Sequence, residues 1–264
     1  MSSIKQQQLL RAGLALALGA GLAFVRARFF SLLLPAAAVC ALALVLTVFL
    51  QEGRRRAEAP ALPPDRLCFG LLALSGFLFL IGVVCFVLDQ AGPLTRAVLT
   101  LFSLLCGVCT LLRLPARDQG QRSAVCALPP VFLMACYLLI LYRANGDNPY
   151  LETYGTEIAV VLLALLGVYF CTAPRFETHR PRLYGCALTL ALTAILQELI
   201  FALLHWAQVM DILRFSPGAL ALLAACGGLI LCGLHCVPER LPAPPAEEEA
   251  APEEDAPEED APEH

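Results

Sequence analysis

Residues 67–88, LCFGLLALSGFLFLIGVVCFVL, run for 22 positions without one charged side chain. A helix needs about 20 mostly apolar residues to cross the hydrocarbon core of a bilayer. A surface helix of a soluble domain would instead carry a polar face along this length. The stretch therefore predicts an α-helix that spans a membrane.

Comparable apolar stretches lie on both sides of this one, separated by short connections with helix breakers such as Gly92-Pro93 and Ser216-Pro217. Ser216 is expected to cap a helix that begins at Pro217. Pro35 is expected to kink the second span. We predict an all-α transmembrane bundle over residues 1–237, possessing eight spans near 9–25, 29–50, 67–88, 96–113, 126–142, 157–174, 183–205 and 217–237.

Composition separates this apolar body from an acidic tail at residues 238–264. Hydrophobic residues make up 59 % of the chain and charged residues 15 %, against about 25 % charged in soluble domains. The tail holds eleven acids and one Arg, a net charge of −10, which leaves +6 for residues 1–237 and −4 for the whole chain. It repeats Ala-Pro-Glu-Glu-Asp at 251–255 and 256–260. Regular Pro and like charges predict a disordered segment. It is either merely solvated or paired with a basic surface, that of a protein partner or of the chain's own Arg54-Arg55-Arg56 loop.

The basic residues predict an orientation, because Lys and Arg are retained on the cytoplasmic side. With the N-terminus inside, thirteen of them lie on the cytoplasmic side and five outside. Both termini are then cytoplasmic, in a cell membrane. The first span could instead be a cleaved signal peptide, since Lys5 and Arg11 precede it, although no convincing cleavage site follows.

Two helix ends resemble each other and suggest an internal duplication. LCGVC at 105–109 leads to RLPA at 113–116, and LCGLHC at 231–236 leads to RLPA at 240–243. An offset of four spans would give two parallel four-helix halves. Chance similarity between Leu/Ala/Cys-rich helices is the alternative.

The polar residues within the spans gather in 183–205. Thr189, Thr193, Gln197 and His205 share one helical face, and Glu198 lies beside it. Intramembrane ionisable residues usually face the bundle interior and often mark a substrate or proton path. The alternative is that these side chains hydrogen-bond neighbouring helices.

Twelve cysteines lie in or beside the apolar stretches. A secreted disulfide scaffold would place them in polar loops, so we interpret them as small residues that pack between helices. Cys106-x-x-Cys109 and Cys232-x-x-His235-Cys236 could hold a metal, but thiols within apolar helices stay protonated and inert. We predict no metal, cofactor or nucleic-acid site.

Asn148-Pro149-Tyr150-Leu151, the following helix to 174, and Arg180-Pro181-Arg182 resemble a stretch of uncharacterised small polytopic membrane proteins of anaerobic Gram-positive bacteria. The resemblance covers about 60 residues and implies a bacterial cell membrane, without an assigned activity.

Three function classes stay open. A permease for a small molecule or ion is favoured by the polar face and the suggested duplication. A non-catalytic scaffold, sensor or partner subunit that acts through the acidic tail is the alternative. An enzyme is less favoured, because no nucleophile elbow or phosphate-binding loop is present.

Overall fold

The structure is a computed structural model that describes residues 2–29, 32–54, 66–89, 92–114, 124–146, 151–173, 181–205 and 216–236. These residues form eight long α-helices and no strand. The predicted tail at 238–264 lies outside them. The helices are α1 (Ser2–Arg28), α2 (Leu33–Arg54), α3 (Arg66–Leu88), α4 (Pro93–Leu112), α6 (Pro129–Ala144), α7 (Leu151–Thr172), α8 (Pro181–His205) and α9 (Pro217–His235).

Six of these helices are long and apolar enough to cross a membrane, while the apolar parts of α2 (Leu33–Val48) and α6 (Pro129–Ala144) are shorter. Helices span bilayers because every backbone hydrogen bond closes within the segment. Large apolar side chains cover the outward faces of the bundle, among them Leu42, Leu74, Leu139, Leu162 and Leu203. The chain is an integral membrane protein with multiple spans, and the count of eight is approximate.

Prolines determine several helix starts. The Ser216 hydroxyl accepts a hydrogen bond from the Ala219 N–H at 3.3 Å, and Pro217 is the first residue of α9, as predicted. α6 begins at Pro129, later than the predicted 126, because Pro needs no N–H partner in the first turn. The predicted kink at Pro35 is wrong for the same reason, since α2 begins at Leu33 and Pro35 falls in its first turn.

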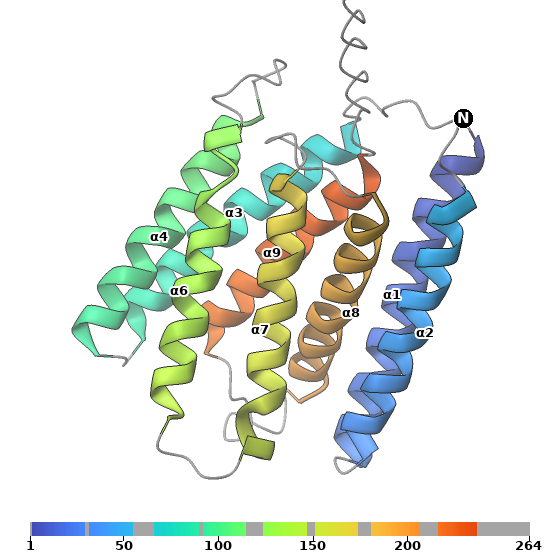
Figure 1. Ribbon diagram of the computed structural model, residues 1–264. Helices are drawn as coiled ribbons and strands as arrows, with labels where there is room; N and C mark the ends of the chain where they lie inside the picture. Colours follow the sequence, from blue (N-terminus) through green and yellow to red (C-terminus); the bar gives the residue numbers. More distant parts are fainter. Residues whose placement is uncertain are drawn as a thin grey trace, which may run out of the picture.

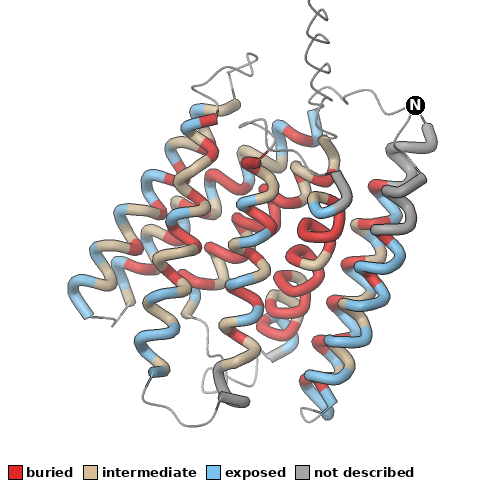
Figure 2. Tube along the Cα trace, viewed as in Figure 1, coloured by how far each residue is buried: buried red, intermediate tan, exposed pale blue. Residues whose placement is uncertain are grey.

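The eight helices alternate in direction, so the start of α1 and the end of α9 lie at the same end of the bundle (Figure 1). α8 packs against α1, α2, α7 and α9, and α9 packs along α3. Figure 2 shows that buried residues concentrate on α8 and α9. In each, 67 % of the most apolar 18-residue window is buried, against 28–39 % in the other spanning helices. These two helices are therefore the core of the bundle.

The predicted duplication would pair α3 with α8 and α4 with α9. α3 packs along α9, but α8 makes no comparable contact with α4 among the described residues. The two halves thus have different neighbours, and the duplication stays a prediction.

Candidate functional site: a buried ion pair beside the polar face of α8

The predicted polar residues of α8 are buried within the bundle. Thr189 is 0 % exposed, Thr193 4 % and Gln197 6 %. The Thr189 hydroxyl donates to the Gly185 carbonyl at 2.7 Å, and the Thr193 hydroxyl donates to the Thr189 carbonyl at 2.8 Å. Both hydroxyl protons are therefore used inside α8, as is common for Ser and Thr in membrane helices.

α1 lies directly over this face, and Gly19 allows the close approach. A Cβ atom added at Gly19 would lie 3.1 Å from the Thr193 carbonyl oxygen and 3.2 Å from the Gln197 backbone nitrogen. Small residues permit such backbone contact between membrane helices. The polar face of α8 is consequently a packing surface for α1.

At the far end of this contact, Arg26 of α1 forms an ion pair with Glu198 of α8. Their side chains are only 6 % and 4 % exposed. The Arg26 guanidinium carbon also lies 4.2 Å from the centre of the Phe201 ring, within the range of a cation–π interaction. The carboxylate is thus neutralised by a cation that itself stacks on an aromatic ring of α8.

Sequence reasoning found Glu198 but not its partner. Arg26 was expected outside the membrane, just beyond a span ending at 25, whereas α1 continues to Arg28. A usable signal existed, because Arg26 directly follows the predicted span 9–25 and Glu198 lies near the end of the parallel span 183–205, so both fall near the same membrane surface. Comparison of the depths of the charged residues would have proposed this pair.

A second carboxylate, Glu157, is the first residue of the predicted span 157–174 and is buried within α7, at 3 % exposure. α7 begins at Leu151, six residues before the predicted start. The first half of α7 therefore carries a buried carboxylate in addition to Glu198 of α8.

His205 is the last residue of α8. Its side chain lies outside the described part of the structure, so its predicted place on the polar path stays a prediction.

A surface hollow of about 440 Å³ lies elsewhere, between the end of α3 and the start of α4. Its lining is mostly apolar and includes Val87, Pro93, Arg96 and Thr100. None of the predicted site residues of α8 borders it.

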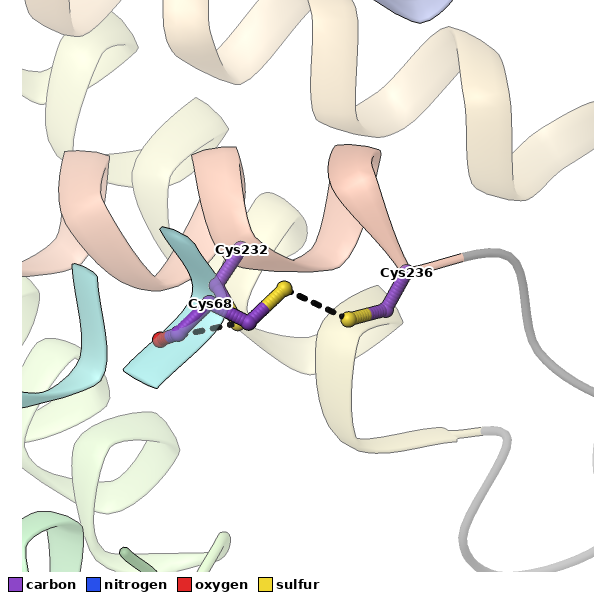
Figure 3. Close-up of side chains that lie close together, drawn as sticks. All are labelled: Cys68, Cys232 and Cys236. Carbon is purple, nitrogen blue, oxygen red and sulfur yellow. Dashed lines mark hydrogen bonds between the residues drawn. The ribbon is translucent and has the colours of Figure 1, made fainter. Parts of the chain in front are cut away.

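The opposite end of the bundle carries a group that could hold a metal. The Sγ atoms of Cys68, Cys232 and Cys236 all lie within 4.8 Å of one another (Figure 3). None of the twelve cysteines forms a disulfide. The sequence motif supplied two of these three cysteines; Cys68, which is 168 residues from Cys236, became its neighbour only through the packing of α3 on α9.

Comparison of the chain with protein-family models, with curated proteins and with solved structures finds no match.

Proposed function

We propose that this protein is a non-catalytic membrane component, a scaffold or partner subunit whose helix bundle anchors the acidic tail at a membrane surface. The observation that carries the proposal is the packing of α1 over the polar face of α8. This packing favours the scaffold or partner subunit, the alternative that the sequence leaves open, over the permease.

A transport path requires polar side chains that reach water or a bound solute. Thr189, Thr193 and Gln197 are at most 6 % exposed. The two hydroxyl protons are used within α8, and Glu198 is paired with Arg26. The ion pair joins α1 to α8, and the hydroxyl bonds occupy donors that a solute would need. Both features suit a packed membrane anchor.

The tail supplies the second part of the proposal. Its net charge of −10 follows from eleven acids and one Arg. Polyanionic segments without a packed core bind basic surfaces through long-range electrostatic attraction. We expect the partner to be a basic protein surface at the cytoplasmic face of a bacterial plasma membrane. The start of α1 and the end of α9 lie at one end of the bundle (Figure 1), which supports termini on the same side.

Cysteine accessibility tests the proposal. Single cysteines replace Thr189, Thr193, Gln197 or Glu198 in a variant that lacks the native cysteines, and membranes are treated with a charged, water-soluble thiol reagent. We expect no labelling at these four positions. Leu192, which is buried at 1 % exposure, gives the unlabelled reference, and the exposed Arg143 at the end of α6 gives the labelled one.

A permease is the second candidate, because a buried charge pair in a membrane bundle is typical of ion-coupled transport. In that reading Arg26–Glu198 is a closed gate that opens on substrate binding. Labelling at 193 and 197 to the level of position 143, with Leu192→Cys still protected, would establish a hydrated path and refute the scaffold proposal.

A further inference from the structure

Three thiols from two helices converge at the end of the bundle that holds the start of α1. Cys68 lies in the first turn of α3, while Cys232 and Cys236 lie in and just after the last turn of α9. The Sγ atoms of Cys68 and Cys236 are 2.9 Å apart. The Cys232 thiol donates to the Cys68 carbonyl oxygen at 3.9 Å. Figure 3 shows the Cys68 and Cys236 sulfurs facing each other, with the Cys232 thiol against the Cys68 backbone carbonyl.

The helix packing fixes this convergence. Residues 232 and 236 are four apart and so share one face of α9. α3 and α9 run in opposite directions and pack along their lengths (Figure 1), with Gly228 of α9 against Ser75 of α3. The first turn of α3 therefore meets the last turn of α9, and their cysteines face each other.

We propose that Cys68, Cys232 and Cys236 form a binding site for a thiophilic metal ion, and that the ion is Cu(I). Thiolates are soft ligands that select Cu(I) over hard cations. Sulfurs bound to one metal at about 2.3 Å lie about 4 Å apart, so the observed group needs only a small opening between Cys68 and Cys236.

The number of ligands decides between the thiophilic ions. Three Cys sulfurs make up the group, and no fourth His, Cys, Asp or Glu donor from the described residues joins it. Structural zinc sites are almost always four-coordinate, and iron–sulfur clusters take four cysteine ligands. Three-coordinate Cu(I) is satisfied by the donors that are present.

Position and charge also suit an ion that enters from water. Cys68 is 1 % exposed and Cys232 9 %, but Cys236 is only half-buried at the helix end, so it gives access to the group. Binding releases the three thiol protons to solvent without any redox step. The bound site carries a net charge of −2, and Arg66 at the start of α3 is the nearby cation in sequence.

A Cu(I) titration of the purified, reduced full-length protein in detergent tests the site, in competition with a chromogenic Cu(I) chelator and without oxygen. Cys68→Ser, Cys232→Ser and Cys236→Ser are each expected to lose about one equivalent of bound Cu(I), because each removes one of three required ligands. Cys40→Ser, Cys85→Ser and Cys136→Ser are matched controls at half-buried thiols outside the group of three and should keep it. X-ray absorption of the loaded protein should show three sulfur ligands.

Protection of the unmodified protein gives a readout that does not depend on how the variants fold. Bound Cu(I) should shield Cys68, Cys232 and Cys236 from alkylation and leave Cys40 and Cys85 as reactive as before, measured by peptide mass spectrometry. Equal Cu(I) uptake by the triple Cys→Ser variant, or no selective protection, would overturn the site. Zn(II) uptake that resists excess Cu(I) would overturn the choice of ion. The proposal is independent of the scaffold function and survives its failure.

Discussion

Arg26 and Glu198 place two opposite charges inside an apolar bundle, where each charge alone would be costly. Moving one ion from water into a protein interior costs on the order of several kcal/mol, even after the protein relaxes around it. The pair offsets this cost by mutual attraction, and Phe201 adds a cation–π contact to the arginine. Removal of one charge should therefore destabilise the bundle more than removal of both.

This dependence predicts a non-additive response to neutralisation. Arg26→Gln and Glu198→Gln should each lower the free energy of unfolding by about 3–5 kcal/mol, because each leaves a buried charge without its partner. The double variant should recover most of the loss. Thermal unfolding in detergent, followed by circular dichroism, measures the coupling.

A reversal of Arg28, which is exposed at the same helix end, controls for net charge and should have little effect. Additive losses in the Arg26/Glu198 double variant would show that the two side chains act separately and would contradict the ion pair as a lock between α1 and α8.

At the scale of the element, the contact between α1 and α8 decides how the first span is interpreted. α1 covers Thr193 and Gln197 through Gly19 and holds Arg26 against Glu198. Removal of a signal peptide would uncover this polar face and strand the carboxylate. We therefore expect α1 to be retained in the mature protein.

The glycines of α1 allow a sharp test of that contact. Gly19→Leu should destabilise the bundle by about 1–3 kcal/mol, because the new side chain has to displace the backbone of α8. Gly21→Leu lies two residues further on the same helix and meets no atom within 4 Å. It should leave the unfolding midpoint near that of the unchanged protein. Equal midpoints for the two variants would contradict the packing of α1 on α8.

Helix positions were readable from the sequence, and helix partners were not. Apolar length and Pro positions predicted all eight helices, with errors at the ends: α6 starts at Pro129 and α7 at Leu151. In lipid, an apolar helix face does not specify which helix it packs against, because a leucine packs equally well against a neighbouring helix or an acyl chain. Glu198 was therefore predictable without its partner Arg26, and the pair Cys232 and Cys236 without Cys68.

At the scale of the whole molecule, an apolar bundle carries its excess of negative charge in residues 238–264. The body is +6 and the tail −10. We expect attraction between the tail and the proposed basic partner to weaken with salt, since the Debye length is about 10 Å at 0.1 M.

Deletion of residues 238–264 should abolish binding of a fluorescent oligolysine peptide to the purified protein and leave the unfolding midpoint of the bundle unchanged. A variant of equal length, with every Glu and Asp of the tail changed to Gln and Asn, separates charge from length and should also fail to bind. Binding that persists in the neutral variant, or that does not fall with rising salt, would contradict an electrostatic tail. Fluorescence anisotropy measures both.

The ion pair also implies a delay during synthesis, because its two residues are made at different times. Arg26 and Glu198 are 172 residues apart, so at about 5–20 residues per second the arginine waits roughly 9–34 s for its partner. During that interval α1 has been delivered to the membrane without the helix that neutralises it. A nascent chain that stalls before α8 would display an orphan cation, a feature by which membrane quality control could distinguish unfinished copies from complete ones.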